Sequence, residues 1–360
     1  MAAAIDNLVD DLERSYKETQ ERMSDPAVYN DRREAAEVGR RLKDLEEPHR
    51  LAHEWRGVRD DLEAARADAD LRELVPELEQ RVAEVEEQLK LALVPSDPAD
   101  RKDVIVEIRQ GVGGDEAALW AADLYRMLTR YAERRGFKVE ELSSSPNDGA
   151  GFKEVTFAVK GDGAFSVFKY EGGTHRVQRV PETESQGRIH TSTATVAVMP
   201  EAEEVEIDVD PNDLKIDVYR STGPGGQSVN TTDSAVRITH VPTGIVVSMQ
   251  DEKSQLQNKD KAMRVLRARL YDRELEQQRA ELDATRRAQI GTGERAEKIR
   301  TYNFPRRRVT DHIGTRGLGP REASYTVHNL EEVLTGSLDE ITAVLQDADK
   351  RKRLEDQASA

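Results

Sequence analysis

Val104-Ile105-Val106-Glu107-Ile108, followed by the turn Gly111-Val112-Gly113-Gly114, is the stretch at which a helical pattern gives way to a mixed one. The β-branched run predicts a strand, and the residues from about Asp115 to Arg135 predict a helix after the turn. A dinucleotide-binding loop is excluded, because Glu116 occupies the third glycine position and Asp115-Glu116 would repel a pyrophosphate. Two interpretations stay open: a capped helix start, which acidic residues favour, or a helix tip that closely approaches a backbone or base edge.

Upstream of this stretch, from Ile5 to about Leu93, apolar residues recur with helical spacing. The two clearest stripes are Ile5, Leu8, Val9 and Leu12, and Leu78, Val82, Val85 and Leu89. Pro76 is placed to start a new helix. The pattern predicts a helical bundle or hairpin that serves for docking or spacing and carries no chemical site.

Downstream, short apolar runs predict strands at Glu154–Val159, Phe165–Tyr170 and Thr195–Met199, with a long ordered loop over the polar stretch Glu171–Thr193. Further elements are predicted as a strand through Leu214, Ile216 and Val218, a hairpin of Ala235–His240 and Gly244–Met249, a long helix over Asn258–Gln289, and a helical tail over Leu330–Leu345. The expected fold is therefore α+β and multidomain.

Three domains are expected in the 360 residues. Residues 1–97 form the N-terminal helical domain. Residues 98–210, completed by about 291–360, form a mixed α/β core. Residues 211–290 form a small α+β domain that carries a glycine-rich loop.

The formal net charge is −16, but the charge is unevenly distributed. Residues 1–100 hold 27 acidic and 15 basic side chains, whereas residues 251–321 hold 11 acidic and 18 basic ones. For the basic stretch, phosphate contact and a solvated helix face both stay open.

No apolar run is long enough for a membrane span, and the acidic N-terminus lacks the features of a signal or transit peptide. There is no cysteine, so neither disulfides nor thiolate chemistry is expected. The seven histidines form no metal-ligand pattern, and no metal or cofactor is expected. We expect a cytoplasmic, monomeric protein.

The sequence Ser221-Thr222-Gly223-Pro224-Gly225-Gly226-Gln227-Ser228 follows the strand predicted through Val218. Its glycines allow unusual backbone shapes and close approach, and the backbone N–H of Gln227 could face a developing oxyanion. A plain glycine-rich hairpin connection is the alternative, and the loop alone does not decide between the two. No general base is evident near it.

Several longer motifs, in the same order, carry a resemblance to the class-one bacterial peptide chain release factors. They are Gly225-Gly226-Gln227 within Arg220–Asn230, Tyr170–Pro181, Gly187–Ser192, Ile299–Pro305 and Arg308–His312. The resemblance extends over essentially the whole chain, including the acidic helical N-terminus.

The resemblance implies a codon-reading site. Pro181-Glu182-Thr183 is similar to the Pro-x-Thr tripeptide of the type that reads UAA and UAG. Thr183 would select the first two bases, His190 would stack beneath the second base, and Gln178 with Thr191 would accept either purine at the third. These roles suit single-stranded RNA, whose splayed bases are stacked on rings and read along their edges.

The same resemblance implies that Gly113 and Glu116 place the helix tip against the first uracil. One departure from the family concerns Glu182, since the middle residue of the tripeptide is usually small. A carboxylate should not help binding near messenger phosphates, so we expect Glu182 to point into solvent.

For chemistry, the resemblance implies hydrolysis of the peptidyl-tRNA ester in the ribosomal peptidyl transferase centre, promoted by the chain but not performed by it as a stand-alone enzyme. The Gln227 N–H would stabilise the oxyanion and the Gln227 side chain would position water, while Gly225 and Gly226 permit the backbone shape. Gln227 is also the residue that this resemblance marks for side-chain methylation.

Residues 291–308 resemble the switch loop that couples codon recognition to placement of the catalytic domain. The rings and arginines in this segment fit an RNA-facing hinge, namely Arg300, Tyr302, Phe304 and Arg306. The implied partners are the 70S ribosome with its ribosomal RNA, the messenger stop codon and the P-site peptidyl-tRNA, a glutamine methyltransferase, and a class-two release factor GTPase.

Two alternatives remain beside a codon-specific termination factor. A ribosome-rescue hydrolase would share the glycine loop but lack the decoding residues, which this chain keeps. A non-catalytic RNA-binding or coiled-coil scaffold would fit the acidic N-terminus and leave the glycine loop unexplained.

Overall fold

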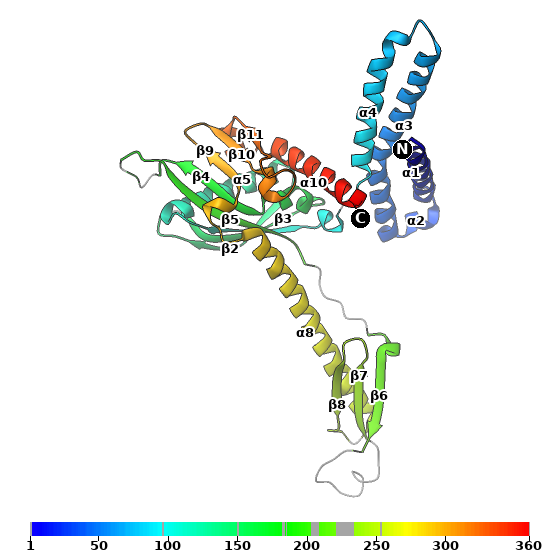
Figure 1. The fold of residues 1–360 in the computed structure, drawn as a ribbon. Helices are drawn as coiled ribbons and strands as arrows, with labels where there is room; N and C mark the ends of the chain where they lie inside the picture. The colour runs from blue at the N-terminus through cyan, green and yellow to red at the C-terminus, as the bar shows by residue number, and fades with distance from the viewer. Residues whose placement is uncertain are drawn as a thin grey trace. The chain divides into compact units, whose positions relative to one another are not determined.

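The computed structural model describes residues 2–95, 97–149, 151–181, 184, 186–202, 209–220, 234–252 and 254–359. The chain divides into two compact units (Figure 1). One unit combines residues 1–98 with 311–325 and 338–360, and the other combines residues 99–310 with 326–337.

The first unit is helical. Its elements are α1 (Ala2–Met23), α2 (Pro26–Asn30), α3 (Arg32–Ala67), the 3₁₀ turn η1 (Arg72–Leu74), α4 (Val75–Ala92), η6 (Ile313–Arg316) and α10 (Asp339–Ser359), with η2 (Pro98–Arg101) at its boundary. Pro76 occupies the first turn of α4, where its missing N–H costs nothing. The helical N-terminal region predicted from the sequence is confirmed.

The apolar stripes of this unit meet in one core. It contains Ile5, Val9, Leu12, Leu51, Ala52, Trp55, Val85 and Leu89. Leu8, which the spacing placed on the same stripe, is instead 43% exposed. Charged side chains tie the helices at the rim, for example Arg56 to Glu13 at 2.5 Å and Arg351 to Glu87 at 2.8 Å.

An eight-stranded sheet forms the centre of the second unit, in the order β11-β10-β9-β4-β5-β1-β3-β2. Its strands are β1 (Val104–Gln110), β2 (Lys138–Pro146), β3 (Phe152–Lys160), β4 (Gly173–Arg179), β5 (His190–Pro200), β9 (Lys298–Asn303), β10 (Arg308–Asp311) and β11 (Tyr325–Val327). Strand β1 pairs antiparallel with both β3 and β5, whereas β4 and β9 are parallel. The parallel pair joins two segments that are far apart in the sequence.

Helix α5 (Asp115–Arg134) packs on one face of this sheet, against β1, β3 and β5. Its buried stripe includes Trp120, Leu124, Met127, Leu128 and Tyr131. The short elements α6 (Ala164–Phe168), η3 (Lys169–Glu171), η5 (Arg295–Glu297) and α9 (Leu330–Leu334) complete the unit.

A second, three-stranded sheet has the order β6-β7-β8 and follows η4 (Pro211–Asp213). Its strands β6 (Leu214–Tyr219), β7 (Ala235–His240) and β8 (Ile245–Met249) are antiparallel. Helix α8 (Gln255–Ile290) covers it, and their shared core consists of Val209, Val236, Ile238, Val247, Ala262, Leu266 and Leu270. The predicted hairpin and long helix are confirmed.

The far end of α8 is anchored to the large sheet (Figure 1). The Gln289 amide donates to the Val198 carbonyl and accepts from the Val198 N–H, both at 2.8 Å. Arg286 pairs with Glu107 of β1. One helix therefore carries the core of the small sheet and ends against the strands of the large one.

Two element predictions are wrong. Phe165–Tyr170, expected as a strand, is the helix α6 with η3, and its buried residues Ala164, Val167 and Phe168 have helical spacing. The polar stretch Glu171–Thr193, expected as a loop, contains β4 and the start of β5. The predicted tail helix is interrupted between α9 and α10, at Gly336 with φ +92°.

The overall class, α+β and multidomain with a helical N-terminal part, is confirmed. The finer division into domains 1–97, 98–210 with 291–360, and 211–290 stays a prediction. In the described part of the chain, no helix is both long and apolar enough to cross a bilayer.

The core beneath the small sheet gives a stability prediction. We expect Leu266→Ala to destabilise the protein by about 2–5 kcal/mol, because a fully buried leucine loses its contacts and leaves a cavity. Leu256→Ala, on the same helix but 68% exposed, should change stability by less than about 0.5 kcal/mol. Urea unfolding of the full chain, with hydrogen exchange of the β7 amides, measures both. Equal effects of the two changes would contradict this packing.

Candidate nucleic-acid interface

Strands β4 and β5 bring the predicted third-base readers together. Their antiparallel register places Gln178 opposite Thr191, and Arg179 opposite His190. Directly opposed residues project to the same face of a sheet, and the next pair along projects to the other. Gln178 and Thr191 therefore share one face, while His190 lies on the opposite face, towards α5.

A third strand extends this row. The parallel register of β4 and β9 places Asn303 beside Gln178. The Asn303 Nδ2 donates to Gln178 Oε1 at 2.9 Å, and the Phe304 N–H donates to the Gln178 carbonyl at 3.0 Å. Thr191, Gln178 and Asn303 thus form a polar row across β5, β4 and β9.

The glycine turn before α5 lies directly against β5. Gly111 N–H donates to the Thr193 carbonyl at 2.8 Å, and Thr193 N–H donates to the Val112 carbonyl at 2.9 Å. Gly113 has φ +142°, and a Cβ there would stand 2.4 Å from the Ser192 Oγ. Glycine is required because only its backbone can approach the strand this closely. The tip of α5 is consequently fixed near Ser192, two residues beyond His190.

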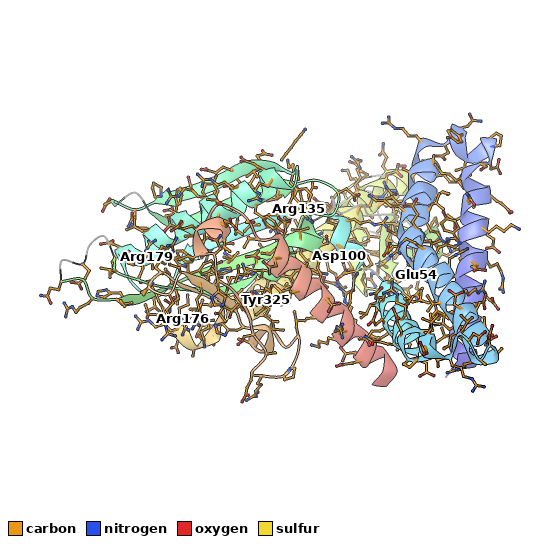
Figure 2. The ribbon with its side chains drawn as sticks, turned by 90° about the horizontal axis from the view of Figure 1, so that it is seen from above. Glu54, Asp100, Arg135, Arg176, Arg179 and Tyr325 are labelled. Atoms are coloured by element: carbon orange, nitrogen blue, oxygen red, sulfur yellow. The ribbon has the colours of Figure 1, made fainter. Side chains whose placement is uncertain are left out.

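Glu116 has an inward side chain. It is 4% exposed and accepts from Arg179 Nε at 2.5 Å, while Arg179 also donates to Asp123 at 2.6 Å. Burial opposes the charge on Arg179, but the bonds to the two carboxylates outweigh it and raise the pKa of Arg179. Arg179, labelled in Figure 2, also lies over the rings of Trp120 and Phe304. The acidic helix start therefore holds β4 as well as favouring the helix.

His190 is half exposed and hydrogen-bonded through Nε2 to Glu184 at 2.9 Å. Glu184 also accepts from the Gln186 N–H at 2.7 Å. That backbone bond is the main cause of the lowered pKa of Glu184, and the His190 bond acts in the same direction. Pro181 is buried. Glu182 and Thr183 of the predicted tripeptide lie outside the described residues.

The predicted switch segment has a buried part and an exposed part. Arg300 and Tyr302 are both 0% exposed and lie within β9, so the expectation that their side chains face RNA is wrong. Phe304 is partly exposed and Arg306 is exposed, in the turn that joins β9 to β10. Arg307, in the same turn, has φ +48°. The part of the segment available to RNA is therefore this turn.

Arg300 and Tyr302 belong to a buried polar network. Arg300 makes two bonds to the Glu171 carboxylate, at 2.7 and 2.9 Å. His175 contacts the Tyr302 hydroxyl at 3.1 Å and the Glu171 carbonyl at 2.9 Å. Paired, hydrogen-bonded charges can be buried, whereas either charge alone would be costly. This network holds β9 to β4 beneath the polar row.

The open face of the polar row also carries positive charge. Arg176, labelled in Figure 2, lies two residues before Gln178, and Lys298 starts β9. Burial lowers the pKa of Arg176, and burial together with the Arg176 charge lowers the pKa of Lys298. Among the described residues, the buried Nε of Arg176 has no hydrogen-bond partner. Anionic RNA would suit such a surface.

Residues Gly225, Gly226 and Gln227 lie outside the described residues, but the strands on both sides of their loop are described. Tyr219 of β6 pairs with Ala235 of β7, so the loop departs from and returns to one end of the small sheet. Asn258, fully buried on α8, donates to the carbonyls of Ser234 and Glu252 at 2.8 Å each and accepts from the Glu252 N–H at 3.0 Å. It fixes the point where the loop rejoins the sheet.

Sequence reasoning missed Asn303, Asn258 and the partner of Arg300. Asn303 stands inside the quoted motif Ile299–Pro305, and membership of that motif was the available signal. Glu171 gave no local signal, because Arg300 lies 129 residues further along the chain. Asn258 gave none because it bonds to main-chain groups, at Ser234 and Glu252, which no side-chain pattern reveals. Within the described ranges, no cluster of His, Asp and Glu could hold a metal ion.

Comparison with known protein families identifies the class. The PCRF domain model matches residues 12–196, and the RF-1 domain model matches residues 203–313. The first match spans the helical region and most of the large sheet, and the second spans the small sheet, α8 and the predicted switch segment.

Individual relatives agree along nearly the full length. The chain is 51% identical over 354 residues to peptide chain release factor 1 of Geobacillus sp. (strain WCH70), covering 96% of each chain. It is 52% identical over 355 residues to the protein of that name from Rubrobacter xylanophilus, covering 94% of this chain and 93% of the relative. The solved structure of RF2 of Thermus thermophilus is 35% identical, with 95% and 96% coverage and a TM-score of 0.48. The chain belongs to the bacterial peptide chain release factor family.

The buried ion pair gives a second stability prediction. Arg300→Met should destabilise the protein by about 3–5 kcal/mol, because it leaves the Glu171 carboxylate buried without its partner. Arg307→Met is the matched control, since Arg307 pairs with Glu331 at the surface and should contribute less than about 1 kcal/mol. Denaturant unfolding compares them, and a loss for Arg300→Met no larger than for the control would contradict the argument.

Proposed function

We propose that this chain terminates translation at the stop codons UAA and UAG, by reading the codon with β4, β5 and the tip of α5 and by promoting hydrolysis of the peptidyl-tRNA ester with the Gly-Gly-Gln loop. Family membership over nearly the whole chain supports termination as the activity. The observation that carries the codon site is the direct opposition of Gln178 and Thr191 at the end of the large sheet.

The two faces of the β4–β5 pair support separate reading of the codon bases. His190 and Thr191 are consecutive on β5 and therefore project to opposite faces. A ring of His190 stacked beneath the second base would leave the third base on the far side, with Gln178 and Thr191. The hydroxyl and amide groups there can donate and accept, which suits recognition of base edges.

At the start of α5, the backbone of Gly113 and Glu116 would contribute to recognition of the first base. One oxygen of the Glu116 carboxylate accepts from Arg179 and the other is buried, so first-base contact through this residue is proposed for its main chain and not its side chain. Thr183, with Pro181 and Glu182, is proposed to complete selection of the first two bases.

For the chemistry, we propose that the Gln227 N–H stabilises the oxyanion formed when water attacks the ester carbonyl. The Gln227 side chain would position that water, and Gly225 and Gly226 would permit the backbone shape. The β6–β7 register and the Asn258 anchor support the presentation of such a loop from a firm base. The remaining reacting groups would come from RNA.

Ribosome-rescue hydrolysis is the second candidate and is not favoured. The relatives named peptide chain release factor 1 match about 95% of the chain, including the region that holds the proposed codon site. We further propose cytoplasmic action on the 70S ribosome, with messenger RNA and P-site peptidyl-tRNA as ligands. Methylation of Gln227 by a glutamine methyltransferase, recycling by a class-two GTPase, and coupling through Phe304 and Arg306 are proposed from the family resemblance.

A codon panel tests the assignment. Release of peptide from purified ribosomal complexes should be at least roughly tenfold faster on UAA and UAG than on UGA or a sense codon, since a good set of base contacts discriminates by about 1–3 kcal/mol. The measurement is the rate of peptide release at saturating and limiting factor. Equal release on ribosomes with an empty A site would instead favour the rescue function.

The catalytic loop has its own test. Gln227→Pro should lower the release rate by about 10²–10³-fold at unchanged ribosome affinity, because proline has no N–H to stabilise the oxyanion. Gln227→Ala keeps that N–H and should lose much less. Single-turnover release on UAA, with binding measured separately, distinguishes the two; undiminished release by the proline variant would refute the role of the backbone.

A further inference from the structure

The amide of Gln178 is held in one orientation by a chain of hydrogen bonds that starts at the main chain. The backbone N–H of Arg306 can only donate, and it donates to Asn303 Oδ1 at 2.9 Å. The other end of that side chain is therefore Nδ2, which donates to Gln178 at 2.9 Å. Only an oxygen can accept this bond, so Oε1 of Gln178 faces Asn303.

The remaining end of the Gln178 amide is its Nε2, which carries two donors. Among the described residues, this atom has no hydrogen-bond partner, and neither has the hydroxyl of Thr191 opposite it. Both side chains are only partly buried, on the face of the sheet that α5 does not cover. The polar groups that remain available for a ligand are therefore the fixed Nε2 donor of Gln178 and the rotatable hydroxyl of Thr191.

This pair has the chemistry to accept either purine. Adenine and guanine both present N7 as an acceptor on the same edge, whereas position 6 is a donor in adenine and an acceptor in guanine. A fixed N–H suits N7 of both. A hydroxyl can accept from N6 of adenine or donate to O6 of guanine. Pyrimidines have no N7.

We propose that Asn303 is a positioning residue for codon specificity: by holding Oε1 of Gln178, it turns Nε2 outward to donate to N7 of the third codon base. This inference rests on the proposed function of Gln178 as a third-base reader. The same bonds link Gln178 to the turn between β9 and β10, because the Arg306 N–H orients Asn303 and the Phe304 N–H donates to the Gln178 carbonyl.

The proposal predicts the effect of an isosteric change. In Asn303→Asp, the second carboxylate oxygen replaces Nδ2 and repels Oε1 of Gln178. The Gln178 amide then turns over, so that Nε2 donates to Asp and Oε1 faces the codon. An outward acceptor opposes N7 of either purine, so release on UAA and UAG should both weaken by roughly tenfold at limiting factor, with little change at saturation.

The decisive test changes the codon atom as well as the protein. Release is measured on UAA and on the same codon with 7-deazaadenine at the third position, which has C–H in place of N7. The wild-type chain should lose roughly tenfold in apparent affinity on the modified codon. Asn303→Asp should show no such loss, because its outward oxygen gains nothing from N7.

Asn329→Asp is the matched control for charge and folding. Asn329 caps α9 by accepting from the Glu332 N–H, a role that aspartate fills equally well. This variant should keep the wild-type loss on the modified codon. A merely structural role for Asn303 would lower release on both codons alike and leave the ratio between them at the wild-type value.

The outcomes distinguish a failure of the proposal for Asn303 from a failure of the proposed function in termination. The proposal for Asn303 is overturned if Asn303→Asp keeps the wild-type penalty for 7-deazaadenine, or if the wild-type chain shows no penalty while it still releases on UAA and UAG. In either case the proposed function stands. Absence of wild-type release on every stop codon would instead refute the proposed function itself.

Discussion

The bidentate pair between Glu171 and Arg300 is the interaction on which the rest of the codon site depends. Both side chains are fully buried, at 0% exposure. Any slip of β9 along β4 would leave a charge in the core without its partner, at a cost of several kcal/mol. The pair therefore fixes the register in which Asn303 lies beside Gln178, and it returns the last part of the chain to a sheet built mainly from its middle.

Strand β4 has two different faces as a result. Its odd-numbered positions meet α5 and the buried network, through His175, Val177 and Arg179. Its even-numbered positions, including Arg176 and Gln178, lie on the face opposite α5. One face supplies rigidity and the other supplies chemistry, which is why a strand so rich in polar residues can still form part of a core sheet.

Amide side chains hold the two ends of helix α8, which packs beneath the small sheet. Near the start of α8, both the Nδ2 and the Oδ1 of Asn258 bond to the main chain, at Ser234 and Glu252. Helix α8 then continues until Gln289 pairs with the backbone of β5. The buried amide of Asn258 and the partly buried amide of Gln289 thus fix the two ends of the helix that packs beneath the small sheet.

Much of the architecture could be predicted from local pattern. The strand at Val104–Ile108, the helix after it, the hairpin, the long helix and the N-terminal helices all follow from apolar periodicity, which depends only on neighbouring residues. The short run Phe165–Tyr170 could not be assigned in this way, because a strand and a single helical turn bury such a run equally well. Strand β4 was missed because its polar residues are satisfied by partners that the sequence does not place nearby.

The sequence by itself determined the family, through long motifs in a fixed order, and with it the residues proposed to read the codon and to act on the ester. Tertiary structure alone decided the environment of those residues. It placed Arg300 and Tyr302 inside the core, turned Glu116 towards Arg179, and set Asn303 against Gln178. The physical reason is that burial and hydrogen-bond partners depend on strand register and on contacts between distant parts of the chain, 63 residues apart for Glu116 with Arg179 and 125 for Gln178 with Asn303.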